Sequence, residues 1–186
     1  NAGSGADTIT AGSGDDTIDA GTGNDSIDAG DGANEIDAGD GDDVITTGTG
    51  DDTIDGGTGA DVISSGDGND SIAGGEGHNN IIAGSGADTI TAGTGDDTVD
   101  AGTGDDSINA GDGANDIDAG DGDDTIVTGD GNDTIDGGAG DDTFVLTGGD
   151  DTITGGEGSD IFDWDGTGDI EITDFDAGTS GQEDED

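Results

Sequence analysis

An apolar residue occurs at every ninth position along most of the chain, without a phase slip over 18 units. The series is Ile9, Ile18, Ile27, Ile36, Ile45, Ile54, Ile63, Ile72, Ile81, Ile90, Val99, Ile108, Ile117, Ile126, Ile135, Phe144, Ile153 and Phe162. Glycine stands four positions before this residue in all 18 units and six positions before it in 17, with Thr147 as the exception. Such a fixed period indicates a repeat architecture, in which stacked units bury a core that no single unit can bury.

The composition opposes folding in water. The 186 residues include 50 acidic residues, one His and no Lys or Arg, so the formal net charge is −50. Leu, Ile, Val and Phe make up only 15% of the chain. Few aliphatic residues combined with a high net charge are typical of disordered chains. Because the register of the repeat is so strict, we expect a chain that is disordered alone and ordered by a ligand that lowers its charge.

Several classes of function are excluded by the same composition. Without Lys or Arg, the chain has no such cation to contact the phosphates of nucleic acid or of an anionic membrane surface. No apolar run approaches the length that spans a bilayer, so we expect no membrane insertion. The absence of Cys excludes disulfides and thiolate metal sites.

Each unit reads approximately A/G-G-x-G-x-D-T-I-x. The two glycines permit backbone conformations that residues with a Cβ atom avoid, so this half is predicted to form a tight turn. The Asp-Thr-Ile-x half is short and β-prone, and it carries one inward apolar side chain. Two turns and two strands make a coil of 18 residues, and the 18 units make about nine coils. The predicted fold is all-β: a parallel β-roll, or β-solenoid, with two short parallel sheets and a thin core.

Candidate metal ligands stand two positions before each apolar residue, where 15 units have Asp and three have Asn. With an 18-residue step, one edge of the solenoid is predicted to carry Asp16, Asn34, Asp52, Asp70, Asp88, Asp106, Asp124, Asp142 and Asp160. The opposite edge is predicted to carry Asp7, Asp25, Asp43, Asp61, Asn79, Asp97, Asn115, Asp133 and Asp151.

Carboxylates stacked one strand spacing apart repel one another unless a cation lies between them. Carboxylate and carbonyl oxygens without thiolates favour a hard ion with flexible coordination, which is Ca²⁺ before Mg²⁺, Zn²⁺ or copper. Two edges with eight gaps each give a ceiling of about 16 ions. Sites beside Asn34, Asn79 and Asn115 are expected to be weaker, because a neutral amide offers one oxygen and no charge. Bound Ca²⁺ would stabilise the fold, since its binding free energy adds to the free energy of folding.

The units also resemble a known family. GGEGHNNII at residues 74–82, GGTGADVIS at 56–64 and GGAGDDTFV at 137–145 resemble the G-G-x-G-x-D-x-U-x nonapeptide of RTX (repeats-in-toxin, hemolysin-type calcium-binding) proteins. The resemblance implies a parallel β-roll with Ca²⁺ between successive turns. It also implies a secreted, extracellular or cell-surface protein exported by a type I system. The first glycine of the motif is mostly Ala here, as at Ala11 and Ala20.

Three segments are expected along the chain. Residues 1–163 form the nonapeptide roll, 164–178 form a C-terminal capping segment with Trp164, and 179–186 form a solvated acidic tail. The period ends after Phe162, because Glu171 occupies the next apolar position. The first unit is truncated, so its open end is expected to continue in further repeats or to contact another subunit.

The sequence favours a calcium-binding structural module over an enzyme. Candidate modules are a spacer, an adhesin, a surface-layer or matrix protein, or an export-and-folding domain. No catalytic set stands out where every unit supplies Asp, and His78 reads as an exposed turn residue. Two alternatives stay open. The Thr residues that precede the apolar series could form ice-binding ladders, or the chain could be the C-terminal secretion domain of an enzyme or toxin whose active domain lies upstream.

Overall fold

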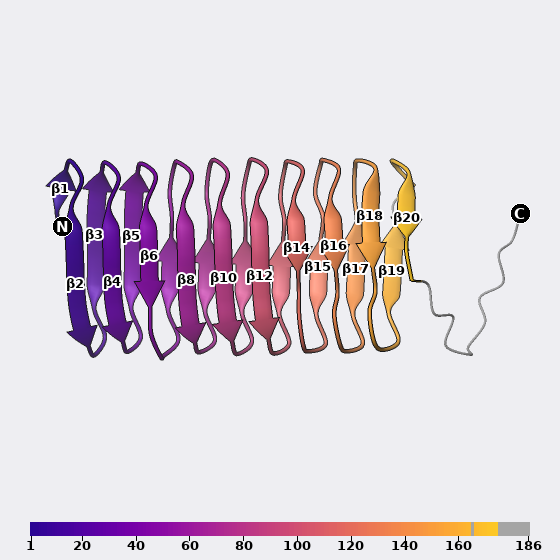
Figure 1. Ribbon diagram of the computed structural model, residues 1–186, viewed down its shortest axis with the longest axis horizontal. Coiled ribbons are helices and arrows are strands. Elements are labelled where there is room, and N and C mark those ends of the chain that lie inside the picture. Colours follow the sequence, from indigo (N-terminus) through magenta and orange to yellow (C-terminus); the bar gives the residue numbers. More distant parts are fainter. Residues whose placement is uncertain (165, 175–186) are drawn as a thin grey trace, which may run out of the picture.

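The structure is a computed structural model that describes residues 1–164 and 166–174. Twenty short strands wind into an elongated solenoid with two parallel sheets of ten strands each (Figure 1). One sheet contains β1 (Gly3–Ser4), β3 (Thr17–Thr22), β5 (Glu35–Asp40), β7 (Thr53–Asp55), β9 (Ser71–Ala73), β11 (Thr89–Thr91), β13 (Ser107–Asn109), β15 (Thr125–Val127), β17 (Thr143–Leu146) and β19 (Ile161–Trp164). The other contains β2 (Thr8–Ser13), β4 (Ser26–Asp31), β6 (Val44–Thr47), β8 (Val62–Asp67), β10 (Asn80–Ser85), β12 (Thr98–Thr103), β14 (Asp116–Asp118), β16 (Thr134–Asp136), β18 (Asp151–Thr154) and β20 (Ile170–Ile172).

The register of the sheets follows the sequence repeat. Ile81 of β10 pairs with Ile63 of β8 on one side and with Val99 of β12 on the other, a step of 18 residues each way. The strands from β2 to β19 correspond one to one to the 18 units of the apolar series. The predicted parallel β-solenoid with 18-residue coils and two parallel sheets is therefore confirmed.

The turns stack glycine on glycine. Gly57 and Gly59 have φ angles of 93° and 133°, which L-residues with side chains rarely adopt. A Cβ atom at either position would also lie 2.0 Å from a carbonyl oxygen of the previous coil, that of Gly39 or Gly41. These two contacts explain why the glycines recur in almost every unit: the coils could not approach to strand spacing with a side chain there.

The core contains a second row of inward side chains that the sequence analysis missed. Each strand was expected to bury one residue of the apolar series, and these residues are indeed buried. Because side chains alternate along a strand, the residue two positions later also points inward where the extended chain continues. This position is Ala in many units, as at Ala20, Ala83 and Ala101, all 0% exposed. The frequent Ala in place of the first motif glycine is thus a core residue.

Polar residues in this second row are hydrogen-bonded along the solenoid. The Ser65 hydroxyl donates to the carbonyl oxygen of Ala83 at 2.8 Å, and the Thr47 hydroxyl donates to the carbonyl oxygen of Ser65. The Thr128 hydroxyl donates to the carbonyl oxygen of Thr147 at 3.0 Å. These bonds satisfy the hydroxyl groups that burial separates from water.

The C-terminal end extends the solenoid beyond the nonapeptide series. The rings of Phe144 and Phe162 stack with their centroids 4.8 Å apart in β17 and β19. Strand β20 then pairs with β18 after a step of 19 residues, so that Ile172 lies opposite Ile153 and the extra residue moves Glu171 to the exposed side. Trp164 donates its indole N–H to the carbonyl oxygen of Thr167 at 2.8 Å.

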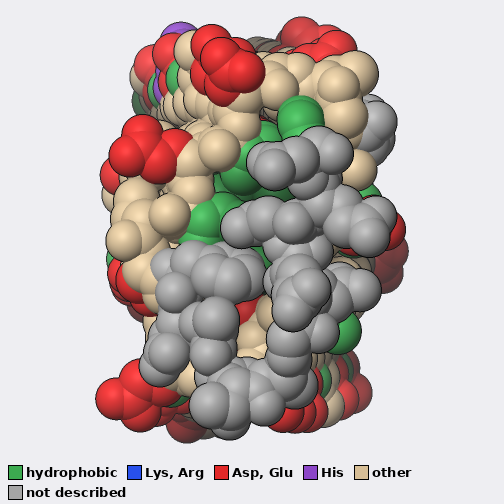
Figure 2. All heavy atoms as spheres, turned by 90° about the vertical axis from the view of Figure 1, so that its right-hand side faces the viewer, with side chains coloured by type: hydrophobic (Ala, Val, Ile, Leu, Met, Phe, Trp, Pro, Cys, Tyr) green, Lys and Arg blue, Asp and Glu red, His purple; other side chains and the backbone are tan. Residues whose placement is uncertain are grey.

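This end overlaps the predicted capping segment, 164–178. Within that segment, residues 175–178 lie outside the described residues, as does the predicted acidic tail, 179–186. Seen along the long axis from this end, hydrophobic side chains lie inside the cross-section and acidic side chains lie around it (Figure 2). Across the described ranges, no helix is long and apolar enough to cross a membrane.

The burial pattern predicts opposite effects for two neighbouring substitutions. Ile108 is 1% exposed and faces the opposite sheet, whereas Ser107 points to solvent. Ile108→Asp would place an unpaired carboxylate in the core and is expected to destabilise the chain by about 3–5 kcal/mol or more. Circular dichroism during thermal unfolding at saturating Ca²⁺ measures this difference. Ser107→Asp is the matched control and should unfold close to the wild type; equal losses in both variants would refute the inward register.

Candidate metal centre

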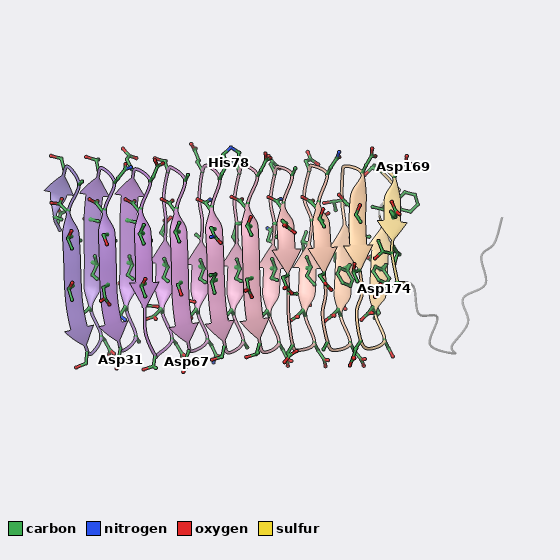
Figure 3. The ribbon with its side chains drawn as sticks, in the orientation of Figure 1. Asp31, Asp67, His78, Asp169 and Asp174 are labelled. Atoms are coloured by element: carbon green, nitrogen blue, oxygen red, sulfur yellow. The ribbon has the colours of Figure 1, made fainter. Side chains whose placement is uncertain are left out.

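The turn residues singled out from the sequence line two edges of the solenoid. Figure 3 labels Asp31 and Asp67 in the lower turns and His78 in the upper turns. The lower edge therefore carries the row from Asp16 to Asp160, and the upper edge carries the row from Asp7 to Asp151. The Asp side chains within the rows are almost wholly buried, and those near the ends of the solenoid, at Asp7, Asp16 and Asp160, are half-buried.

One carboxylate oxygen of each buried Asp binds the neighbouring coil. Oδ1 of Asp106 accepts the backbone N–H of Asp88 at 2.7 Å, and Oδ1 of Asp124 accepts that of Asp106 at the same distance. The same bond recurs along both edges, for example from the Asp25 N–H to Oδ1 of Asp43 at 2.7 Å. A hydrogen bond to a charged acceptor is stronger than a neutral one, so these bonds tie each turn to the next.

The other carboxylate oxygen, Oδ2, is buried in 13 of these residues and has no hydrogen-bond partner. They are Asp7, Asp25, Asp43, Asp52, Asp61, Asp70, Asp88, Asp97, Asp106, Asp124, Asp133, Asp142 and Asp151. An unpartnered buried oxygen of a charged group costs several kcal/mol, and native proteins avoid it. Since the chain has no Lys or Arg, a bound cation or protonation would have to compensate this charge.

Main-chain carbonyl oxygens face the same space as these Oδ2 atoms. A methyl group at Gly56 would lie 2.9 Å from Oδ2 of Asp61 and 2.7 Å from the carbonyl oxygen of Gly74, one coil further on. At Gly137 the corresponding distances to Oδ2 of Asp142 and the carbonyl oxygen of Gly155 are both 2.6 Å. In these two turns, where Gly stands at the position that is Ala in many coils, a carboxylate oxygen and a carbonyl oxygen thus lie near one small region, and a cation close by would offset their negative charge.

The donor set fits Ca²⁺. Within residues 1–164 and 166–174, no three His, Cys, Asp or Glu side chains gather around one point. A metal ion in the turns must therefore take most of its ligands from main-chain carbonyls, with the Asp carboxylates adding charge. Ca²⁺ accepts six to eight oxygen ligands in flexible geometry and commonly uses backbone carbonyls, whereas Zn²⁺ prefers nitrogen and sulfur.

Burial and mutual repulsion raise the pKa of several of these carboxylates. Burial raises the pKa of Asp106 to about 7 from its ordinary value of 3.8, and the nearby charges of Asp88 and Asp124 raise it further. Burial is also the largest cause that raises the pKa of Asp61, Asp133 and Asp142, each to about 6. Without a cation, the folded state is thus strained by its own negative charge at neutral pH.

A second row of acceptors on the outside of the turns was not expected from the sequence. Where it is Asp, Asn or His, the side chain directly before a buried Asp or Asn can accept the backbone N–H of the next coil, as Oδ1 of Asp51 does from Asn69 at 2.8 Å. His78 is exposed as predicted, and its ring nitrogen Nδ1 accepts the N–H of Asp96 at 2.9 Å. The frequent Asp and Asn at this position was the signal that could have revealed the row.

These features together define a calcium-binding β-solenoid. The sequence matches the family of the RTX calcium-binding nonapeptide repeat in overlapping segments of four copies, at residues 1–36, 37–72, 73–108, 91–126, 109–144, 118–152 and 136–169. The chain belongs to this family. Its repeats bind Ca²⁺, and the repeat array described here is a non-catalytic module. A search among curated proteins found no match.

The raised pKa values predict that protonation of the Asp carboxylates in acid partly replaces Ca²⁺ in stabilising the folded state. Because the folded state binds protons more tightly than the unfolded state, the stabilising effect is present below about pH 4 and is lost as the pH rises through about 6–7. In calcium-free buffer, the β-sheet signal in circular dichroism should therefore increase as the pH falls from about 8 to about 4.

The control is the same titration at saturating Ca²⁺. Ca²⁺ binds the deprotonated carboxylates, so the calcium-dependent signal should weaken over the acidic range in which protons compete. If the calcium-free chain shows no gain of sheet in acid, the carboxylates do not limit its folding.

Proposed function

We propose that this chain is a structural module that charge repulsion keeps unfolded at low Ca²⁺ and that folds when Ca²⁺ fills its turns outside the cell. The observation that carries the proposal is the double row of buried Oδ2 atoms without a hydrogen-bond partner. The proposed ligands are the 15 turn Asp residues, together with main-chain carbonyls of the turns. Asn34, Asn79 and Asn115 supply no carboxylate charge to their turns.

The charge balance supports the coupling between calcium and folding. With a formal charge of −50, the compact chain repels itself strongly, and its buried Asp rows concentrate that repulsion. About 16 Ca²⁺ ions would lower the net charge to about −18, which still favours solubility. Extracellular calcium modules bind with dissociation constants of about 10⁻⁴–10⁻³ M, so such a module stays empty in the cytosol and fills outside.

The regular shape supports a mechanical role. Each strand pairs with its equivalents one coil away, and from β1 to β19 the 18-residue step is kept except for a shift between β4 and β6. A rod of this kind suits a spacer, an adhesin stalk, a surface-layer or matrix element, or a domain that folds after export.

Ice binding is supported less well. The outward row on the even-numbered strands begins with Thr8 and continues through Ser26, but Val44 and Val62 follow in the next two strands. A flat and uniform Thr array is therefore interrupted within the first four coils. Within the described residues, the structure favours none of these roles over a secretion domain of an enzyme.

The proposal predicts a specific response to Ca²⁺. In chelator the chain should give a disordered circular dichroism spectrum and a large hydrodynamic radius, because repulsion between carboxylates exceeds the small apolar driving force. Adding millimolar Ca²⁺ should give a β-sheet spectrum and a roughly twofold smaller radius, as expected for collapse of a chain of this length. Size-exclusion chromatography with light scattering checks the radius and the mass together.

Two controls separate coordination from charge screening. Mg²⁺ at the same concentration should fold the chain poorly, since it requires a smaller octahedral site and gives up water reluctantly. NaCl at equal or higher ionic strength should have little effect, since it screens charge without satisfying the buried oxygens. A chain that is fully folded in chelator, or that NaCl folds as well as Ca²⁺ does, would contradict the proposal.

A further inference from the structure

The three turns that carry Asn keep the bond between coils that the Asp turns make. Oδ1 of Asn34 accepts the backbone N–H of Asp16 at 3.1 Å. Oδ1 of Asn79 and of Asn115 accepts the corresponding N–H one coil earlier, at 3.0 Å and 2.9 Å. All three side chains are buried like their Asp counterparts. Because a backbone N–H requires an acceptor, this bond fixes Oδ1 toward the previous coil and turns Nδ2 toward the inside of the turn.

The inward atom of Asn34 is a donor, and it has partners. Its Nδ2 donates to the carbonyl oxygen of Gly32 at 2.9 Å and to that of Gly30 at 3.3 Å. An Asp at this position would place an unpartnered carboxylate oxygen where this nitrogen lies. The amide thus donates to two main-chain carbonyl oxygens within its own turn.

The other two Asn residues make contacts of the same kind, at longer distances. Nδ2 of Asn115 lies 3.5 Å from the carbonyl oxygen of Gly113, which is the equivalent of Gly32 in its turn. Nδ2 of Asn79 lies 3.4 Å from the carbonyl oxygen of Ala92. Ala92 occupies the same place relative to Asn79 as Gly74 does relative to Asp61, where an unpartnered Oδ2 faces the carbonyl.

We propose that Asn34, Asn79 and Asn115 close their turns without a metal ion, because the amide N–H groups donate to the carbonyl oxygens that Ca²⁺ would otherwise bind. This inference rests on the proposed calcium-dependent folding, and it assigns these three turns a different chemistry. A nitrogen that carries hydrogen atoms also repels a cation, so Ca²⁺ is excluded from these turns and does not merely bind there weakly.

The three asparagines then divide the edges into separate calcium-binding blocks. On the lower edge, Asn34 separates Asp16 from the uninterrupted row Asp52–Asp160. On the upper edge, Asn79 and Asn115 leave Asp97 isolated between two metal-free turns. The number of ions then stays below the ceiling of about 16, because the turns of Asn34, Asn79 and Asn115 hold none.

Counting bound ions tests this inference. Each variant of the full chain is dialysed to equilibrium at saturating Ca²⁺, and the calcium per molecule is measured by elemental analysis. Asn34→Asp and Asn115→Asp should each bind one ion more than the wild type, because each exchanges the inward donor for an unpartnered oxygen. Asp88→Asn, in the middle of the lower row, should bind one ion fewer and still fold in Ca²⁺.

Asn69→Asp is the matched control for added charge. Asn69 is exposed in the turn of Asp70, and its Oδ1 accepts the N–H of Ala87 at 2.8 Å, so the variant adds the same charge on the lower edge without changing a turn interior. It should bind the wild-type number of ions. Wild-type counts in both Asn34→Asp and Asn115→Asp, or an extra ion in Asn69→Asp, would overturn this inference alone. A wild type that binds no Ca²⁺ would overturn the proposed function and this inference with it.

Discussion

The two oxygens of each turn carboxylate have opposite consequences for the fold. Oδ1 is bonded to the neighbouring coil, as between Asp106 and the N–H of Asp88, and this contact favours the stacking of turns. Oδ2 of the same side chain is buried and has no hydrogen-bond partner. The coil geometry that brings the strands into register therefore also builds up uncompensated negative charge. The stability of the folded chain therefore depends on how this negative charge is compensated.

The packing of the rest of the coil leaves few other ways to compensate the buried carboxylate charge. Gly57 and Gly59 stack on glycines of the previous coil so closely that a Cβ atom would collide with a carbonyl oxygen. The core contains one large apolar residue on almost every strand, and its second inward position is often Ala. With the turns packed and the core apolar, compensation must come from small ions or from a change in the turn side chain itself.

Replacing Asp with Asn is the smallest change of the turn side chain that removes the uncompensated charge. It keeps the acceptor that bonds the previous coil and replaces the unpartnered oxygen by a donor, as the contacts of Asn34 with Gly30 and Gly32 show. Under the proposed mechanism, a chain in which every turn carried Asn would need no metal and would lose calcium control of its folding. The mixture of 15 Asp and three Asn turns keeps that control while it interrupts the rows of charge.

The sequence by itself determined the period, the strand and turn halves of each unit, the inward Ile series and the two rows of acidic residues, because a nine-residue repeat permits one register only. It did not reveal the second inward position at residues such as Ala20, since small residues are also common in turns. Nor did it reveal the shift of one residue that places Ile172 opposite Ile153. Only the tertiary structure decided which oxygen of each Asp is bonded and which is not, because that distinction arises when one coil lies against the next. The same contact distinguishes Asn from Asp, two side chains of nearly equal shape whose inward atoms differ in the sign of the charge they present.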